Sequence, residues 1–400
     1  MRDGWRLEKL GEISEVIMGR QLSPSKKMGT RPRPYIRAAN IGSWGISLNE
    51  VFEMDFTEDE EARFASRIGD TLLVEGGNEK SVGCPGLVTE NEAGLCIQNT
   101  VIRCRVKNPE VFHPEFQFQV LRYMYWRRDF AQLCAGTTIM HLGQKRAESV
   151  PILLPPLPEQ KRIVDLISSV DSYIEALQLQ LESAKGSRNA VLHELLTAGG
   201  ENWVETNLAE VAVLNPSEPA LSNTDHFAPM DAVHVGKRWL QYTEERRDRN
   251  GARARAGDVL FARITPCLEN GKVAQVQSEL QRCGGSTEFI VVRGTEKCTS
   301  DFLYFWCTLK ENRDKAAELM TGTTGRQRLS SQDLGSLQLW LPSIKEQEQI
   351  VSIISEFDSL IDSTENAISQ AQNLRSALLS DLLSGEHEIP ASYDKAMGAA

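Results

Sequence analysis

Apolar residues recur every three or four positions along two segments of the chain, residues 157–197 and 344–384. The first series is Ile163, Ile167, Val170, Ile174, Leu177, Leu181, Ala184, Val191 and Leu195. Arg188 occupies the place in this series between Ala184 and Val191. The second series is Ile350, Ile354, Phe357, Ile361, Thr364, Ile368, Ala371, Arg375, Leu378 and Leu382. A period of about 3.5 residues is typical of a coiled-coil seam. Each segment is predicted to be one helix, roughly 60 Å long at 1.5 Å per residue, and the two helices are expected to pair antiparallel.

The second segment is a copy of the first. Shifted by 187 positions, the two align without a gap, and 15 of the 41 residues are identical. Shorter matches lie outside the helices, where Gly69-Asp70-Thr71-Leu72 recurs as Gly257-Asp258-Val259-Leu260, and Gly136-Thr137-Thr138 as Gly322-Thr323-Thr324. The chain is therefore expected to contain a pseudo-twofold internal repeat, in which a globular module followed by a long helix occurs twice.

The sequence between the helices predicts two mixed α/β modules. Runs rich in β-branched residues, such as 100–106 and 289–293, alternate with glycine-rich turns, and each module has one helix predicted near residues 114–133 or 300–320. The fold class expected is mixed α/β (α+β), with two globular domains separated by two long antiparallel coiled-coil helices. The expected boundaries are 1–150 and 200–341 for the globular domains, 151–199 and 342–387 for the helices, and 388–400 for a flexible tail.

Composition excludes some classes of protein. No stretch approaches the length of a membrane span, and Met1 to Trp5 lack the apolar core of a signal peptide. The eight cysteines form no C-x-x-C pair, and the six histidines are scattered. A zinc site or a disulfide framework is therefore not expected, and the cytoplasm is the expected compartment.

The net charge of −11 is unevenly distributed. Residues 1–150 carry 20 basic and 20 acidic side chains, and residues 201–341 carry 17 and 19. The part after residue 341 carries 3 basic and 10 acidic side chains. The globular modules are thus nearly neutral, so local basic clusters on them are able to bind phosphates, whereas the acidic helices would be repelled.

Such clusters occur in both modules. Residues 16–49 contain no acidic side chain but include Arg20, Lys26, Lys27, Arg31, Arg33 and Arg37. The second module has Arg246, Arg247, Arg249, Arg253 and Arg255 close together, and Arg326 and Arg328 after its Gly-Thr-Thr turn. For any single cluster a solvated surface loop is the alternative interpretation, and the presence of clusters in both halves favours phosphate binding.

The junction between each module and its helix carries a resemblance. Gly136-Thr137-Thr138, His141-Leu142 and the run from Pro151 to Val164 resemble the junction of a target-recognition domain and a conserved helix in the DNA-specificity (S) subunit of type I restriction-modification systems. The run from Leu341 to Val351 is similar. Inside the modules, residues 35–41, 75–77 and 98–99 resemble one class of these domains, and residues 260–272 and 285–289 another.

The resemblance implies a DNA-specificity subunit that performs no catalysis itself. In that family each globular domain recognises one half of a split target on double-stranded DNA, and the helices set the spacer and dock two methyltransferase (M) subunits. Restriction (R) subunits join through the complex. No cofactor is expected in this chain, because S-adenosylmethionine belongs to the methyltransferase, and ATP and magnesium belong to the motor subunit. No membrane partner is implied, and two diverged modules imply an asymmetric target.

Polar and basic side chains in the loops are the expected DNA contacts. Phosphate contacts are expected from Arg20, Lys26, Lys27, Arg326 and Arg328, and base discrimination from side chains near Arg37, Asn40, Gln98 and Asn99, and near Thr265, Asn270, Lys272 and Thr287. The remaining candidates are Arg31, Arg33, Thr137, Thr138, His141, Arg263, Thr323, Thr324 and Gln327.

An enzyme and a coiled-coil scaffold are the two alternative classes of function. A DNA methyltransferase needs an Asn/Asp-Pro-Pro-aromatic site, and residues 215–218 (Asn-Pro-Ser-Glu) lack the second proline and the aromatic residue. An ATP-driven motor needs G-x-x-x-x-G-K-S/T, which residues 269–273 do not provide. A coiled-coil scaffold that binds no DNA explains the helices but leaves the basic loops without a role.

A few residues have competing interpretations. Arg188 and Arg375 are expected either to form ion pairs where the helices cross or to extend their charged ends toward solvent there, with contact to DNA as the alternative. His141 is either a turn residue or a DNA contact, and Glu288 either accepts a hydrogen bond from cytosine or holds a loop. Trp5 and Trp203 are expected core anchors. Apolar residues beside the seam are expected to face a protein partner; these are Leu166, Leu192, Leu196, Ile353, Leu379 and Leu383.

Overall fold

The computed structural model describes residues 4–22, 30–42, 45–134, 139–220, 226–245, 251–323, 325–390 and 392–396. It divides into two compact units. The first comprises residues 1–177 and 367–400, and the second comprises residues 178–366. Each unit therefore contains one globular module together with part of each long helix.

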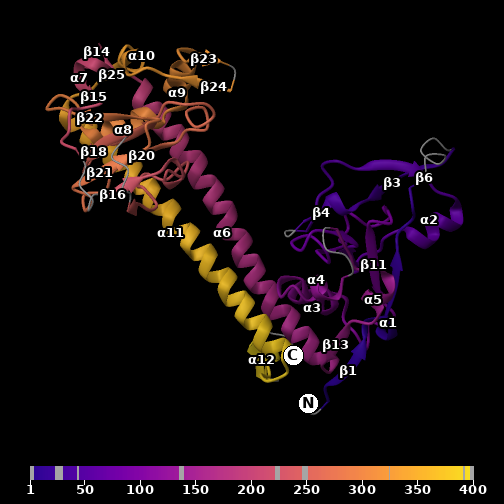
Figure 1. The fold of residues 1–400 in the computed structure, drawn as a ribbon. Coiled ribbons are helices and arrows are strands. Elements are labelled where there is room, and N and C mark those ends of the chain that lie inside the picture. The colour runs from indigo at the N-terminus through magenta and orange to yellow at the C-terminus, as the bar shows by residue number, and fades with distance from the viewer. Residues whose placement is uncertain are drawn as a thin grey trace. The chain divides into compact units, whose positions relative to one another are not determined.

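The centre of the first module is a four-stranded antiparallel sheet in the order β2-β11-β7-β9. Figure 1 labels its strand β11. Its strands are Ser14–Met18, Val101–Val106, Thr71–Val74 and Pro85–Leu87. A second sheet, β10-β3-β6, consists of Cys96–Ile97, Pro32–Ile36 and Phe52–Asp55. Three ribbons are β1 with β13 (Arg6–Lys9, Pro151–Leu154), β4 with β5 (Ile41–Gly42, Gly45–Ile46) and β8 with β12 (Gly76–Gly77, Met140–His141).

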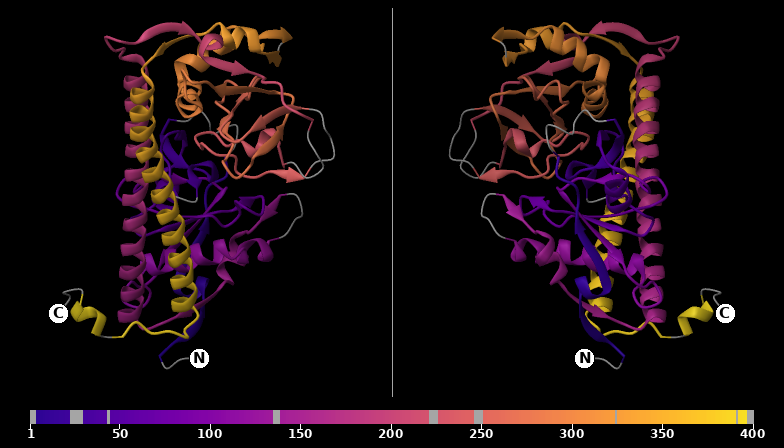
Figure 2. Two further views of the ribbon diagram at one scale, coloured as in Figure 1. Left: turned by 90° about the vertical axis from the view of Figure 1, so that its left-hand side faces the viewer. Right: turned by 90° about the vertical axis from the view of Figure 1, so that its right-hand side faces the viewer.

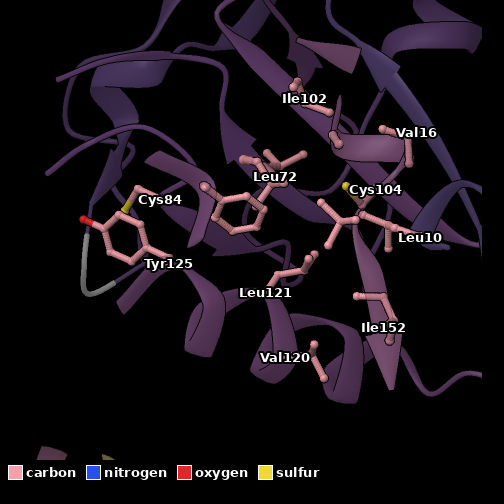
Figure 3. Packing of buried hydrophobic residues seen from close by; sticks show 14 of the residues in the cluster. Leu10, Val16, Leu72, Cys84, Ile102, Cys104, Val120, Leu121, Tyr125 and Ile152 are labelled. Atoms are coloured by element: carbon pink, nitrogen blue, oxygen red, sulfur yellow. The ribbon is translucent and has the colours of Figure 1, made fainter. Parts of the chain in front are cut away.

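Short helices surround these sheets. They are α1 (Leu10–Ile13), η2 (Ala38–Asn40), α2 (Glu58–Phe64), α3 (Pro114–Trp126), α4 (Asp129–Leu133) and α5 (Gln144–Glu148). A further short helix, α12 (Ser392–Ala396), follows the second long helix. Buried apolar side chains from β2, β7, β11, α3 and β13 meet in the core (Figure 3). Leu72, Ile102, Leu121 and Ile152 are completely buried there. The strand at residues 101–106, whose first four residues are all buried, and the helix at residues 114–126 thus both contribute apolar side chains to this core.

The second module repeats this plan. Its central sheet has the order β15-β22-β19-β20 (Ala212–Leu214, Phe289–Gly294, Val259–Ala262, Val273–Gln275). The other sheet is β17-β16-β21-β18 (Glu244–Glu245, His226–Ala228, Arg282–Gly285, Ala252–Arg255), and the ribbons are β14 with β25 (Val204–Asn207, Gln338–Leu341) and β23 with β24 (Thr321–Thr323, Arg326–Arg328). The short helices are α7 (Leu208–Val211), η3 (Met230–Ala232), α8 (Ser300–Thr308), α9 (Lys310–Glu318) and α10 (Ser331–Gly335).

The single helix predicted in each module is in fact two helices. In the first module, Arg128 has a left-handed backbone conformation (φ 66°), which ends α3 and begins α4. In the second module, Leu309 adopts an extended conformation between α8 and α9 and is buried. A local hydrophobic period continues through such a break, so the sequence pattern did not reveal it.

The two long helices are α6 (Leu157–Thr197) and α11 (Ile344–Leu383), and they lie side by side (Figure 2). In the first unit, residues 157–177 of α6 face residues 367–383 of α11, and in the second unit residues 178–197 face residues 344–366. Every predicted seam position is buried or half-buried. The predicted mixed α/β fold with paired helices is therefore confirmed.

Two ion pairs between the long helices involve residues that are equivalent in the internal repeat. Arg188 donates from Nε to Oδ1 of Asp358 at 2.5 Å in the second unit. In the first unit, Arg375 donates from Nη2 to Oδ2 of Asp171 at 3.2 Å. Each arginine is 187 positions from the other, and so is each aspartate. The same residue pair thus joins the antiparallel helices twice, which confirms the ion pairs expected for both arginines.

The start of each long helix is held by the same contacts. Gln160 donates to the carbonyl oxygen of Val111 and accepts from the backbone N–H of His113, at the start of α3. Gln347 makes the equivalent bonds to Lys297 and Thr299, at the start of α8. These two glutamines are completely buried and fix each module to its helix.

Trp5 and Trp203 also pack against the beginnings of the long helices. Trp5 is 5% exposed and donates from its indole N–H to Glu159 at 3.1 Å. Trp203 is half-buried against the core of the second unit. Ser343 forms the capping box with Glu346, with hydrogen bonds at 3.0 and 3.4 Å. The packing of both tryptophans agrees with their expected roles as core anchors.

The apolar residues beside the seam do not behave as expected. Leu192 and Leu196 are buried in the core of the second unit, and Leu379 is buried in the core of the first. Leu166 and Leu383 pack against that same first core, and Ile353 is the member of the set that is exposed, at 41%. The expectation of a partner-facing apolar strip was therefore wrong for five of the six residues, because their side chains pack on the modules of this chain.

Residues beyond α11 contact the first unit. Ile389 is 6% exposed within its core, and Arg162 donates to both carboxylate oxygens of Asp394 at 2.8 and 2.6 Å. All eight cysteines lie in the described part of the chain and are free thiols. Among the described helices, none is long and apolar enough to cross a membrane.

Candidate nucleic-acid interface

The arginines of the basic segment in the first module are neutralised by carboxylates. Arg20 is 6% exposed, contacts Glu60 of α2 at 2.9 Å through its Nε, and stacks over the ring of Phe56 at 4.9 Å. Its guanidinium is therefore part of the module's interior. A phosphate would reach Arg20 after displacement of Glu60.

Arg31 and Arg33 share the carboxylate of Glu61. Arg31 donates to it at 3.0 Å and also contacts Glu58 at 2.5 Å, while Arg33 donates at 2.8 Å. The hydrogen bond from Arg33 lowers the pKa of Glu61, so this carboxylate is ionised at neutral pH. Both arginines are about one-third exposed and lie on one acidic helix end, where an incoming phosphate would compete with glutamate.

Arg37 and Asn40 hold the loop that follows β3. Arg37 contacts Glu50 at 2.5 Å and stacks over Phe52 at 4.2 Å. Asn40 is 4% exposed, donates its amide to the carbonyl oxygens of Ser47 and Glu50 at 2.9 Å, and accepts from the backbone N–H of Arg37. The amide of Asn40 is thus engaged with loop backbone, and it shapes the surface around Arg37.

Gln98 and Asn99 lie next to this loop. The hydroxyl of Thr100 donates to Gln98 at 3.1 Å and accepts from the backbone N–H of Ala38 at 3.0 Å. The backbone N–H of Asn99 donates to the carbonyl oxygen of Arg20 at 2.9 Å. The fold therefore brings together four predicted site residues from distant parts of the sequence: Arg20, Arg37, Gln98 and Asn99.

His141 lies apart from that group, on the ribbon formed by β8 and β12. Its ring is 59% exposed, and Nδ1 lies 3.0 Å from a carboxylate oxygen of Glu75, which is 12% exposed. His141 is paired with Gly76 across the ribbon. The histidine thus has a structural partner and an exposed ring edge, so both interpretations of this residue remain compatible with its geometry.

In the second module the hairpin β23-β24 presents several predicted residues together. Thr323, Arg326 and Arg328 are exposed on it. Gln327 donates its backbone N–H to the hydroxyl of Thr265 at 3.1 Å, and the backbone N–H of Thr265 donates to the carbonyl oxygen of Gln327 at 3.1 Å. The hairpin is thereby fixed to the segment after β19.

Arg328 forms a two-pronged ion pair with Glu288. Its Nε donates to Oε2 at 2.9 Å, and its Nη2 donates to Oε1 at 2.7 Å. The hydrogen bonds from Arg328 lower the pKa of Glu288. Glu288 therefore orients an exposed guanidinium instead of offering its own oxygens to a base, which agrees with the loop-holding interpretation.

Arg263 and Thr287 line a pocket of about 360 Å3 beside this hairpin. Its other walls are residues 215–218 and 251–253, and Phe289 closes one side. The Nε of Arg263 is shielded from water and has no hydrogen-bond partner among the described residues. Arg263 therefore contributes a positive charge to the lining of this pocket.

Asn270 and Lys272 lie in the turn before β20. Asn270 is exposed. Lys272 donates from Nζ to the carbonyl oxygen of Met230 at 2.9 Å and lies 3.8 Å from Asp231. The remaining predicted residues lie outside the described part of the chain: Lys26, Lys27, Thr137, Thr138 and Thr324.

Within the described residues there is no group of three His, Cys, Asp or Glu side chains arranged to hold a metal ion. Asn215, the first residue of the motif weighed against a methyltransferase site, accepts a hydrogen bond from the backbone N–H of Val291 at 3.0 Å and has a positive φ of 46°. Its side chain thus fastens β15 to β22.

Sequence reasoning missed the acidic partners of these arginines. Glu75 and the carboxylates of α2 were not among the expected site residues, and Glu288 was considered without Arg328. The acidic run at residues 58–61 was visible, but only the fold brings it to arginines 20–40 positions earlier. Because these arginines are paired with carboxylates, the surface attracts DNA phosphates less strongly than unpaired arginines would, and nonspecific binding of DNA is weaker.

Comparison with known proteins places these features in context. The family described as type I restriction modification DNA specificity domain matches residues 2–183 and 201–373. The EcoKI specificity subunit of Escherichia coli K12 is 24% identical over 96% of this chain and 89% of its own length. The putative MjaX specificity subunit of Methanocaldococcus jannaschii is 20% identical over 97% and 94% of the two chains.

Two solved structures are similar in fold. A chain from a type I R-M system, solved to explain complex assembly and conformational transition, has a TM-score of 0.62 at 19% identity and covers 96% of this chain and 98% of its own. The type I S subunit from M. genitalium has a TM-score of 0.57 at 16% identity, with coverage of 96% and 97%. The similarity extends over both modules and both long helices.

Proposed function

The chain belongs to the family of type I restriction-modification DNA specificity proteins, and we propose that each of its two modules recognises one half of a split target on double-stranded DNA. The observation that carries the proposal is the duplicated structure. The same arginine-aspartate pair joins the helices in each unit, while the loop side chains differ between the modules. Two different readers on a copied support produce an asymmetric target.

We divide the chain into recognition domains at residues 1–150 and 200–341, spacer helices at 151–199 and 342–387, and a tail from residue 388. Methylation and cleavage are assigned to partner subunits. Two methyltransferase subunits, which bind S-adenosylmethionine, dock on the helices, and restriction subunits, which use ATP and magnesium, join the complex. The protein would work in the cytoplasm, where the DNA is.

The ion pairs of the first module predict weak DNA binding by the isolated chain. Because Arg20, Arg31, Arg33 and Arg37 each contact a glutamate, binding to phosphates releases few counterions unless those pairs open. We expect tight, sequence-selective binding after assembly with two methyltransferase subunits, whose own surface adds phosphate contacts. Gel-shift titrations of the chain and of the complex, on target and random duplexes at several salt concentrations, measure this.

Equal affinity and equal selectivity for the isolated chain and the complex, at the same salt concentration, would contradict the proposal. Absence of any DNA binding by the chain and by the complex would favour a scaffold that binds no DNA. Methyl transfer by the isolated chain would support an enzyme.

The helices are proposed to set the spacer between the half-sites. Four residues inserted near Ala184 in α6, with four more in the facing part of α11 near Thr364, should lengthen each helix by roughly 6 Å, or about two base pairs. The methylated motif should keep both half-sites and gain spacer length, as mapped by sequencing methylated DNA. Changed half-sites with an unchanged spacer would show that the helices do not determine the distance.

A further inference from the structure

Three positions occupy the same place in the two modules but carry different side chains. The first position follows a strand of the central sheet, and the second position comes immediately before the neighbouring strand. Glu75, after β7, donates its backbone N–H to the carbonyl oxygen of Thr100 at 2.9 Å. Arg263, after β19, donates to the carbonyl oxygen of Glu288, also at 2.9 Å. The backbone is thus the same, and the side chains are unrelated.

The third position is His141 in the first module and Arg328 in the second. His141 pairs antiparallel with Gly76, and Arg328 with Ile264, which are the residues next to Glu75 and Arg263. The backbone N–H groups of the next residues, Leu142 and Leu329, donate to the carbonyl oxygens of residues 75 and 263, each at 2.8 Å. The three positions therefore form one structurally equivalent cluster in each module.

In both clusters a largely buried carboxylate lies next to an exposed side chain whose nitrogen atoms form hydrogen bonds. In the first module, Glu75 is 12% exposed beneath His141, which is 59% exposed. In the second, Glu288 is 22% exposed beneath Arg328, which is 46% exposed. The carboxylate belongs to the first of the three positions in the first module (Glu75) and to the second position in the second module (Glu288). In both modules it contacts the side chain at the third position. This arrangement fixes an outward-pointing hydrogen-bonding group at the same point of the module.

We propose that residues 75, 100 and 141 in the first module, and residues 263, 288 and 328 in the second, are the positions that determine which bases each half-site contains. His141 and Arg328 contact base edges, and Glu75 and Glu288 are positioning residues that act through them. This inference rests on the proposed DNA recognition and assigns it to particular side chains. It also moves Arg328 from the expected phosphate contacts to the base contacts.

The chemistry of the second cluster favours guanine. Glu288 binds the Nε and Nη2 side of the Arg328 guanidinium. The N–H groups on the opposite side remain for the O6 and N7 acceptors of guanine, the commonest partner of arginine in the major groove. Arg263 lies next to this ion pair, since its backbone N–H donates to the carbonyl oxygen of Glu288 and its own carbonyl oxygen accepts from Leu329. In the first cluster, Glu75 binds Nδ1 of His141, which leaves Nε2 for the base.

The experiment uses the chain assembled with its methyltransferase subunits, and selects bound duplexes from a library randomised in both half-sites. Arg328→Ala should relax one guanine position in the second half-site and weaken binding to the preferred duplex by about 10- to 100-fold. Glu288→Gln should relax the same position. The first half-site should be unchanged in both variants, which also shows that they are folded.

Matched variants test the first cluster. His141→Ala and Glu75→Gln should alter one position of the first half-site and leave the second intact. Gly76→Ala should act on that same position, because an added Cβ would lie 2.9 Å from Nδ1 of His141 and displace its ring. Arg326→Ala is the control, since this exposed residue on the same strand as Arg328 should lower affinity for all duplexes alike.

The outcomes separate this inference from the proposed function. A selective wild-type complex whose Arg328→Ala and His141→Ala variants keep the same base preferences, with at most a uniform loss of affinity, would overturn the inference alone. A wild-type complex without preference for any sequence would overturn the proposed function and the inference together.

Discussion

Replacing Asp171 by alanine should destabilise the first unit by about 3 to 5 kcal/mol, the usual cost of breaking a buried ion pair from one side. Asp171 is the acceptor for two arginines, Arg375 at 3.2 Å and Arg122 at 3.1 Å. Arg375 is 2% exposed and stacks over Trp126, so its charge has little access to water. Burial, together with the charge of Arg375, lowers the pKa of Arg122 to about 10. Without Asp171, two neighbouring positive charges remain buried together.

The repeat provides the matched control. Asp358 is the copy of Asp171 and pairs with Arg188, which is 13% exposed. Asp358→Ala should therefore cost less than Asp171→Ala when both are compared by equilibrium unfolding in urea. Substituting Arg375 by methionine in the Asp171→Ala background should recover part of the loss. Equal effects of the two aspartate variants would show that the second arginine adds nothing.

Replacing Asp70 by alanine should have a comparable effect, again about 3 to 5 kcal/mol. Asp70 is 1% exposed, accepts from Nε and Nη2 of Arg105 at 2.8 and 2.7 Å, and accepts from the backbone N–H of Arg67 at 2.7 Å. Arg103, 1% exposed, lies 3.9 Å from the same carboxylate. The variant would leave Arg105 and the backbone N–H of Arg67 without this acceptor, while Arg103 would keep its hydrogen bond to Glu15 at 2.6 Å.

Asp258, the copy of Asp70, is the control for this second change. It binds Arg293 at 2.7 Å through both of its oxygens, but Arg293 also contacts Glu218 at 2.6 Å. Because Glu218 would remain, Asp258→Ala should shift the urea midpoint less than Asp70→Ala. A larger shift for Asp258→Ala would mean that Glu218 does not compensate for the lost carboxylate.

The sequence predicted the long helices well because their period and their duplication report the same structure. Each seam residue faces a partner with the same spacing, so Arg188 and Arg375 could be assigned to ion pairs before their aspartates were known. The strands at residues 101–106 and 289–293 were also predicted, since β-branched runs bounded by turns are typical of sheet cores. The family followed from the junction motifs, which occur twice.

The candidate site could be predicted only in part. Segment composition showed that residues 16–49 are basic, but the partners of Arg31 and Arg33 come from α2, and long-range pairing of this kind leaves no local signal. The same limit explains the error over Leu192 and Leu379. A leucine beside a helix seam has the same pattern whether it packs on its own module or faces another protein.

The two modules are proposed to recognise separate halves of one DNA target. The direct test replaces residues 201–341 with the corresponding domain of a relative of different specificity, and maps the methylated motif in cells that supply the methyltransferase subunits. One half of the motif should change to that of the donor, while the other half and the spacer length remain. A motif altered in both halves, in a complex that still methylates DNA, would contradict this proposal.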